Sequence, residues 1–266
     1  MKQSLGKLEI QLLAYTQMRQ QSTVRAGELV KVLGLKPEQE RQLFQRLARG
    51  RLIARVRPGL YLVPPRLPVG GAWSPDEITA IETLLQDQNG KYQICGPNTF
   101  NRYNFDTQIP TRLYAYNNRI SGERTIGAVQ LTLIKVTDKR LGGIESVKTP
   151  QGTRAVYSSR ARALVDAIDD WARFDTLPRA YGWIRIEIAR KRVLPADIVG
   201  AALRYANVGT ARRLGVLLEQ ISAAPKLLRQ LEQSLPPSTS LIPWIPTLPK
   251  RGTVNRRWGV VVNANA

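Results

Sequence analysis

Two adjoining stretches decide the fold of the N-terminal part of this chain: PEQERQLFQRLARG, residues 37–50, and RLIARVRPGLYLV, residues 51–63. Pro37 suits the first turn of a helix, and Glu38 and Glu40 favour the positive end of its dipole. Because Gly50 is suited to ending a helix, we predict one from Pro37 to about Arg49. The second stretch predicts a strand, a tight turn at Pro58-Gly59 and another strand.

The predicted helix over residues 37–49 has two distinct sides. At about 100° per residue, Leu43, Phe44 and Leu47 fall together on one side. The opposite side carries Arg41, Gln42, Gln45 and Arg49, with Glu38 among them and Arg46 at the margin. One side can therefore pack against other helices while guanidinium and amide groups point outward.

Two further helices are expected upstream. Apolar residues recur at helical spacing between Leu8 and Met18, and a second helix is expected from Val24 to Leu33, with Arg25 in the place of a cap and Gly34 at its end. Three helices and a basic hairpin are the plan of a winged helix-turn-helix, so we predict a DNA-binding domain over residues 1–66. The alternative is a winged helix that serves in protein interaction or dimerisation.

The expected DNA contacts follow from groove geometry. A helix fits the major groove, where Arg pairs with guanine and Gln with adenine, and arginines on the hairpin would reach flanking phosphates or the minor groove. The expected DNA-binding residues are Lys36, Arg41, Gln42, Gln45, Arg46, Arg49, Arg51, Arg55 and Arg57.

A larger domain is expected after a linker rich in Pro and Gly at residues 64–71. We predict that this domain spans residues 72–266, with a mixed α/β part (72–157) and a mainly helical part (158–266) that ends in a strand. The chain as a whole is thus predicted to be α+β. The expected helices are 74–87 with Ser74 as its cap, a short one after 96–98, one capped by Ser158 or Ser159 that runs to 173, and 179–191, 195–206, 210–223 and 225–234. The expected strands are 92–95, 113–116, 125–126, 129–136, a hairpin over 147–157, and 257–262.

The chain is strongly basic, with 40 Lys and Arg against 20 Asp and Glu among 266 residues. Residues 1–66 carry 13 basic and 4 acidic side chains, residues 67–150 carry 9 and 8, and residues 151–266 carry 18 and 8. Two basic ends thus flank a nearly neutral middle, which favours polyanions as partners, although weak non-specific RNA binding is the alternative. No basic amphipathic helix or lipid-anchor pattern is present, so no membrane partner is expected. Because the first residues lack the apolar segment of a secretory signal, we expect a cytoplasmic protein.

Few residues of the sequence are suited to catalysis. The chain has no histidine and one cysteine, Cys95, which excludes histidine-based sites and multi-cysteine zinc sites. Asp166, Asp169 and Asp170 share a predicted helix, where a solvated face next to arginines is favoured over a magnesium site. Cys95 is expected in the core. We therefore predict no catalytic residue, no metal and no cofactor.

Two arginine pairs lie beside apolar residues: Arg212-Arg213 and Arg256-Arg257. Each pair is expected either to contact nucleic acid or an acidic partner, or to pair with internal carboxylates such as Glu219 and Asp197.

Several strings along the chain resemble the AbiEi family of antitoxins. For the family's N-terminal winged helix they are AGEL (26–29), LGL (33–35) and LARGRLIARVRPGLY (47–61). For its C-terminal domain they are TPQG (149–152), RARALVD (160–166), RRLGVLLE (212–219) and NRRWGVVVN (255–263), in matching order. The readers of DNA implied by this resemblance are Arg41, Gln42, Gln45 and Arg49, with Arg51, Arg55 and Arg57 on the wing.

The resemblance implies a transcriptional repressor of its own operon that binds promoter inverted repeats through its winged helix. It also implies an antitoxin whose C-terminal domain counteracts an AbiEii-type nucleotidyltransferase toxin without a stable complex, as in a type IV toxin–antitoxin pair. The charge of residues 151–266 suggests that this domain also touches DNA or shields RNA. The alternatives are a winged-helix regulator without a toxin partner and, less favoured, a magnesium-dependent enzyme that processes nucleic acid.

Overall fold

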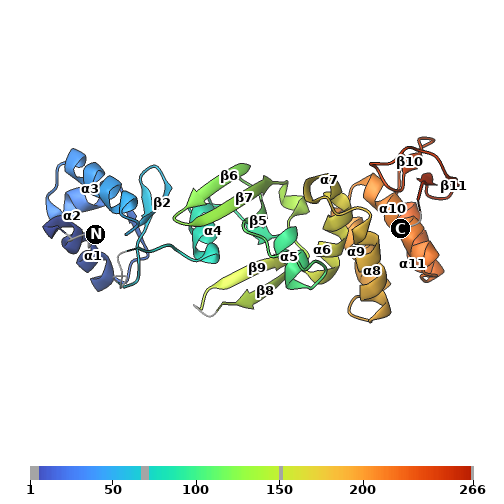
Figure 1. The fold of residues 1–266 in the computed structure, drawn as a ribbon, viewed down its shortest axis with the longest axis horizontal. Coiled ribbons are helices and arrows are strands. Elements are labelled where there is room, and N and C mark those ends of the chain that lie inside the picture. The colour runs from blue at the N-terminus through green and yellow to red at the C-terminus, as the bar shows by residue number, and fades with distance from the viewer. Residues whose placement is uncertain (1–5, 67–71, 150–151, 265–266) are drawn as a thin grey trace.

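The computed structural model describes residues 6–66, 72–149 and 152–264. It shows an elongated molecule in which three units follow one another along the long axis (Figure 1). A small unit of helices and strands contains the N-terminal residues, a six-stranded sheet lies in the middle, and a helical unit with a short sheet contains the C-terminal residues. The predicted α+β class is confirmed.

The N-terminal unit packs three helices on a three-stranded antiparallel sheet. Its elements are α1 (Lys7–Met18), β1 (Thr23–Arg25), α2 (Glu28–Leu33), α3 (Pro37–Arg49), β2 (Ala54–Arg57) and β3 (Leu60–Leu62). The strand order is β1-β3-β2, and Gly59, with a φ of 78°, lies in the turn between β2 and β3. Leu12, Leu29 and Leu43 are completely buried between the helices, and Phe44 stacks on Tyr61. The predicted helices near 8–18 and 37–49 are confirmed.

The predicted second helix is wrong in its first half. Residues 23–25 form β1, which pairs with β3, and α2 begins only at Glu28. Gly27 precedes α2 with a φ of 87°, a left-handed conformation that suits glycine, so Arg25 does not occupy the cap position. Residues 23–25 form a strand because their backbone groups pair with residues 60–62. The local sequence around residues 23–25 does not contain these partners.

The middle unit is built on a mixed sheet with the order β6-β7-β5-β4-β9-β8, in which β5–β7 and β4–β9 are parallel pairs. Its elements are α4 (Glu77–Gln86), β4 (Tyr92–Ile94), α5 (Pro97–Arg102), β5 (Leu113–Asn117), β6 (Gly122–Ile126), β7 (Val129–Lys135), the 3₁₀ turn η1 (Asp138–Arg140), β8 (Ile144–Lys148) and β9 (Arg154–Ser158). The turn of the predicted 147–157 hairpin includes residues 150–151, which lie outside the described residues.

Helix α4 begins later than predicted. Asp76 caps it by accepting hydrogen bonds from the backbone N–H groups of Ile78 (3.1 Å) and Thr79 (2.9 Å). The hydroxyl of Ser74, the predicted cap, instead accepts from Ala128 N–H at 2.9 Å, in the turn between β6 and β7. An aspartate two residues downstream is an equally good cap, and the contact with the distant turn decides between them.

The N-terminal and middle units share a hydrophobic core. Val56, Leu60 and Leu62 of the β2–β3 hairpin are buried together with Ile81 and Leu85 of α4. The predicted linker lies between these two parts, and its residues 67–71 are outside the described residues. The hairpin is therefore held against the rest of the molecule over its apolar face.

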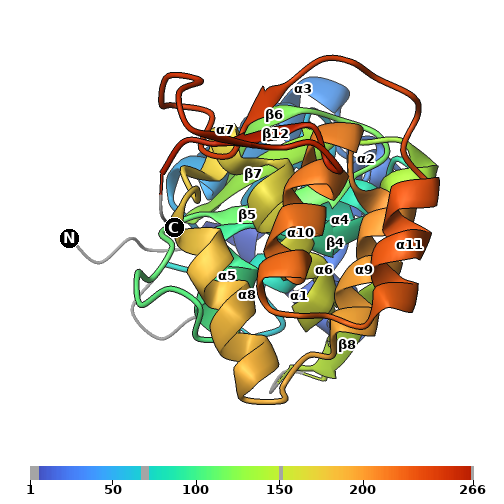
Figure 2. The same cartoon turned by 90° about the vertical axis from the view of Figure 1, so that its right-hand side faces the viewer.

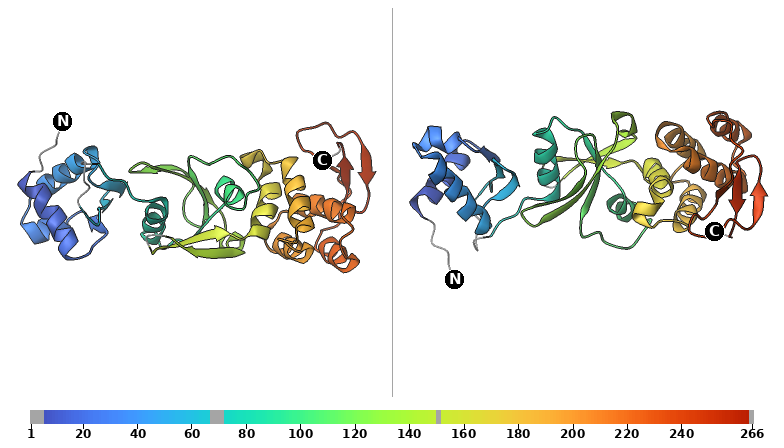
Figure 3. Two further views of the ribbon diagram at one scale, coloured as in Figure 1. Left: turned by 60° about the horizontal axis from the view of Figure 1, so that its bottom comes forward. Right: turned by 90° about the horizontal axis from the view of Figure 1, so that it is seen from above.

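The C-terminal unit contains six helices and a small sheet. Its elements are α6 (Arg160–Asp169), α7 (Trp171–Phe174), α8 (Arg179–Ala189), α9 (Pro195–Tyr205), α10 (Val208–Gln220), α11 (Pro225–Gln233), β10 (Ile242–Pro243), β11 (Thr253–Asn255) and β12 (Val260–Val262). Viewed along the long axis, α8 to α11 face the reader, with the terminal strands above them (Figure 2). The same succession of three units appears in both views of Figure 3.

Two expectations for this unit need correction. The helix predicted to run to residue 173 is α6, which is capped by Ser159 and ends at Asp169. The separate short helix α7 follows Asp170. The strand predicted over 257–262 is limited to residues 260–262, since Gly259 has a φ of 61°. Its partner strands β10 and β11 are too short to show an alternation of buried and exposed residues in the sequence. Among the described residues, no helix is both long and apolar enough to cross a membrane.

Candidate nucleic-acid interface

The carboxylate of Glu40 fixes α3 relative to α2. This side chain is 3% exposed and accepts hydrogen bonds from the backbone N–H groups of Gly27 (2.7 Å) and Leu29 (2.8 Å). These are donors at the start of α2, which have no partner within their own helix. Glu40 thus caps the preceding helix from the buried side of α3, a role that its place in the first turn of α3 does not reveal.

The opposite side of α3 faces outward, as predicted. Leu43, Phe44 and Leu47 are buried, whereas the predicted readers Arg41, Gln42, Gln45 and Arg49 are exposed. A hollow of about 720 Å³ lies between α2, α3 and the β2–β3 turn, lined in part by Lys31, Arg41, Gln45 and Arg55. The helix and the hairpin therefore border one hollow, whose lining combines these polar side chains with apolar residues such as Val30 and Phe44.

The cations of this surface differ in how they are paired. Lys36, Arg41, Arg49, Arg51 and Arg55 are exposed and form no ion pair within residues 6–66, 72–149 and 152–264. Arg46 lies 3.5 Å from a carboxylate oxygen of Glu9 but is still 57% exposed. Five of the predicted residues thus carry charges that the described chain does not neutralise.

Arg57 forms an ion pair with a carboxylate of the middle unit. Its guanidinium binds both carboxylate oxygens of Asp87, just after α4, and Arg25 of β1 lies 2.9 Å from the same carboxylate. The hydrogen bond from Arg57 holds the pKa of Asp87 below its usual value. We name this trio, Arg25, Arg57 and Asp87, the hairpin clamp. The predicted DNA contact of Arg57 would thus involve a side chain that is 41% exposed and already paired with Asp87. Neither Arg25 nor Asp87 could be found from local sequence.

Arg212 and Arg213 are buried, at 6% and 8% exposure, and do not lie on a surface that a partner could reach. Arg212 donates to the carbonyl oxygens of Trp258 (2.6 Å), Ser240 (2.6 Å) and Gly259, and Arg213 donates to that of Pro243 at 3.2 Å. The two side chains hold the terminal sheet on α10. Both alternatives predicted for this pair, partner contacts and carboxylate pairing, are therefore wrong.

The second arginine pair is divided. Arg257 lies 3.1 Å from Glu219 and 2.8 Å from Glu232, which agrees with the predicted internal pairing. Arg256 is exposed and has no ion pair in the described part of the chain. Among the four arginines of these two pairs, Arg256 alone therefore offers a charge at the surface that no described residue neutralises.

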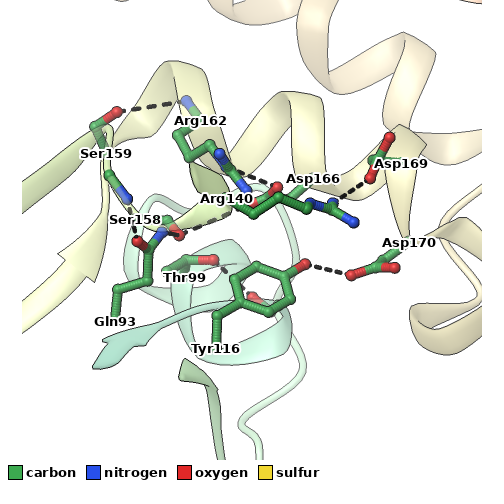
Figure 4. A network of polar contacts seen from close by, with 12 residues as sticks. Gln93, Thr99, Tyr116, Arg140, Ser158, Ser159, Arg162, Asp166, Asp169 and Asp170 are labelled. Carbon is green, nitrogen blue, oxygen red and sulfur yellow. Dashed lines mark hydrogen bonds and ion pairs between the residues drawn. The ribbon is translucent and has the colours of Figure 1, made fainter. Parts of the chain in front are cut away.

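The three aspartates of α6 and its end lie in a buried polar network between the middle and C-terminal units (Figure 4). Arg162 donates to Asp166 at 2.8 Å, Arg140 binds Asp169, and the hydroxyl of Tyr116 donates to Asp170 at 2.5 Å. Asp166 is 1% exposed, so the predicted arginine neighbours are present but the predicted solvated face is not. Burial raises the pKa of Asp166 to about 6, against the opposing effect of Arg162.

This network is suited to joining two units rather than to holding a cation. One oxygen of each carboxylate already accepts from a guanidinium or a phenol, so a magnesium ion would have to compete with these donors. Among the described residues, no group of three or more His, Cys, Asp or Glu side chains is arranged to hold a metal. Cys95 is completely buried, and burial raises the pKa of its thiol, as in a core cysteine.

Comparison with known proteins identifies a similar fold. No family model matches the chain, and no curated protein matches it. The chain is similar to the crystal structure of the Rv2827c protein from Mycobacterium tuberculosis, with a TM-score of 0.57 and 12% identity over 97% of this chain and 92% of that one. At this identity the similarity concerns the fold, which extends over nearly the whole of both chains.

Proposed function

We propose that the chain is a DNA-binding transcriptional repressor whose N-terminal unit is a winged helix-turn-helix. In this proposal α2 and α3 form the helix-turn-helix, α3 enters the major groove, and β2–β3 is the wing. The observation that carries the proposal is the exposed side of α3, where arginine and glutamine side chains stand beside unpaired cations. Such side chains can read base edges and bind phosphates at the same time.

The second part of the proposal is that the chain acts as an antitoxin of a type IV system, repressing its own operon. Its support is the resemblance of the strings at 149–152, 160–166, 212–219 and 255–263 to the AbiEi family. The functional partner would then be an AbiEii-type nucleotidyltransferase toxin, counteracted without a stable complex. Co-expression with a nucleotidyltransferase encoded next to this gene tests it: rescued growth is expected, and growth arrest despite expression of the chain contradicts it.

Protection mapping of the promoter upstream of the gene tests the DNA-binding part. The purified protein is expected to protect inverted repeats. Arg41→Ala or Gln45→Ala should weaken binding to a protected repeat by about 1–3 kcal/mol and relax its sequence preference. Arg55→Ala should instead weaken binding to the repeat and to random duplex alike, and lower the salt dependence by about one unit. Equal effects of the α3 variants on every sequence would contradict base reading by α3.

A further inference from the structure

A groove lies where the N-terminal unit meets the middle unit, beside the C-terminal end of α3. It has a volume of about 560 Å³ and is lined by Arg49, Arg51, Arg55, Trp73 and the turn between β6 and β7. Pockets that hold small organic ligands have volumes of about 300–1,000 Å³ and are frequent between domains. The size and the place of the groove are therefore those of a ligand site.

The charge of this groove indicates an anionic ligand. Three arginines line it, one each from α3, from the turn after α3 and from β2, and none of them forms an ion pair with a described residue. No Asp or Glu is among the described residues that line it. Arginine binds phosphate through paired, charge-assisted hydrogen bonds, so three free guanidiniums around one hollow favour a phosphate group.

The backbone of Arg51 supplies an independent observation. Arg51 has a φ of 54°, in the left-handed region that glycine adopts at lower cost. Its N–H donates to the carbonyl oxygen of Ala48 at 3.1 Å, and its own carbonyl accepts from Trp73 N–H at 2.6 Å. An arginine thus occupies a position whose conformation favours glycine, and this residue lines the groove.

The remaining wall is apolar. Trp73 is partly buried, packs against the core of the hairpin and α4, and lines the groove together with the buried Ile53. Aromatic side chains stack well on nucleobases. An intact duplex would offer phosphates to the arginines, but its bases stay stacked within the double helix. It would therefore make no base contact with Trp73. A free ligand with both a phosphate and a planar ring would use both the arginines and Trp73.

We propose that this groove binds a free nucleoside phosphate, with the phosphates on Arg49, Arg51 and Arg55 and the base against Trp73. Arg49, Arg51 and Arg55 also belong to the expected DNA surface, so the nucleotide and the operator compete for them. The inferred nucleotide site depends only on the residues of the groove, whereas the competition with DNA depends also on the proposed DNA-binding function.

Calorimetric titration of the full chain with ATP, adenosine and inorganic phosphate tests the site. ATP is expected to bind more tightly than either fragment. Arg51→Gly, which removes the guanidinium and suits the backbone, should weaken ATP binding by about tenfold or more. Arg204→Ala is the matched control, since it removes an exposed cation from α9 and should leave ATP binding unchanged. Absence of ATP binding, or equal binding by Arg51→Gly and the wild type, overturns the site.

A competition experiment separates this inference from the proposed function. Saturating ATP should lower the affinity of the wild type for the protected repeat and have little effect on Arg51→Gly. If the repeat binds in a Gln45-dependent manner while ATP does not bind, only the nucleotide site fails. If ATP binds through Arg51 but no duplex is recognised, the repressor proposal fails and the site stands. ATP binding that leaves the affinity for DNA unchanged overturns the competition.

Discussion

Single carboxylates and guanidiniums fix the positions of larger parts of this molecule. Glu40 joins α2 to α3, Asp87 joins the hairpin to α4, and Arg212 joins the terminal sheet to α10. Each is buried or nearly so, and each binds groups that are distant in the sequence. A charged residue that is removed from water must be paired, which explains why all three have several partners.

Removing the carboxylate of Glu40 should destabilise the N-terminal unit. Glu40→Ala leaves the N–H groups of Gly27 and Leu29 buried without an acceptor, and we expect a loss of about 1–3 kcal/mol in the free energy of unfolding. Glu38→Ala is the control, since Glu38 is exposed in the same turn of α3. Urea denaturation measures both variants, and equal losses would refute the capping role of Glu40.

At this scale the sequence predicts the two faces of α3 but not the residues that bind across elements. Helical periodicity alone separates Leu43, Phe44 and Leu47 from Arg41 and Gln45, because one helix face must be buried. No periodicity separates Arg57 from Arg55: they alternate with Val56 on one strand, and only the position of Asp87 decides that one is clamped. For Arg212 the sequence left open a partner contact or a pairing with internal carboxylates, whereas backbone carbonyls of the terminal segment surround it.

At the level of elements, the β2–β3 hairpin has two tasks that compete for its side chains. Its apolar face packs on α4, and its clamp residue Arg57 binds Asp87, while Arg55 remains exposed beside α3. The boundaries of α3 and α9 agree with the predicted ones, whereas α4 begins later and α6 ends earlier than predicted. The short strands β1 and β10 were not predicted, because their pairing partners and not their own side chains define them.

Asp87→Asn should loosen the hairpin clamp. The two arginines would keep only a neutral acceptor, and we expect about 1–2 kcal/mol of destabilisation, since Arg25 and Arg57 remain partly solvated. The pKa of Asp87 is lowered by folding, so its ionisation stabilises the wild type above the unfolded-state pKa of about 3.9 and this contribution is lost as the pH falls through the folded pKa. The stability difference between wild type and variant should therefore shrink in denaturation series below about pH 4; a difference that is constant with pH would exclude the clamp as its source.

Arg212→Ala should release the terminal sheet. Three carbonyl oxygens lose their donor and a buried cavity forms at α10, which together cost about 3 kcal/mol or more. Limited proteolysis should cut the variant after residue 234 while DNA binding is retained. Arg256→Ala, an exposed neighbour, should resist proteolysis like the wild type, and a matching sensitivity of both variants would contradict the internal role of Arg212.

At the scale of the whole molecule, the N-terminal unit is not an independent body on a tether. The hairpin residues Val56, Leu60 and Leu62 are at most 7% exposed because α4 and the sheet cover them. The sequence predicted two domains with a linker over residues 64–71, of which 67–71 lie outside the described residues. The sequence does not reveal that α4 and the sheet cover the hairpin, because apolar residues buried against a second domain have the same pattern as those buried within the first domain.

A fragment of residues 1–66 should therefore be much less stable than the same unit in the full chain. It exposes three large apolar side chains, each worth about 1.5–3 kcal/mol when buried. We expect a broad thermal transition or self-association of this fragment in circular dichroism and light scattering. Extension to residue 90, which adds α4 and Asp87, should sharpen the transition; two fragments of equal stability would show that the shared core contributes little.

The left-handed backbone at Arg51 has a consequence for directed evolution. Glycine at this position relieves steric crowding, so random mutagenesis under selection for heat resistance alone should enrich Arg51→Gly among the survivors. Such survivors would tolerate higher temperatures and hold anions less well at the junction of the two units. The position would then mark a trade-off in which robustness increases at the expense of recognition.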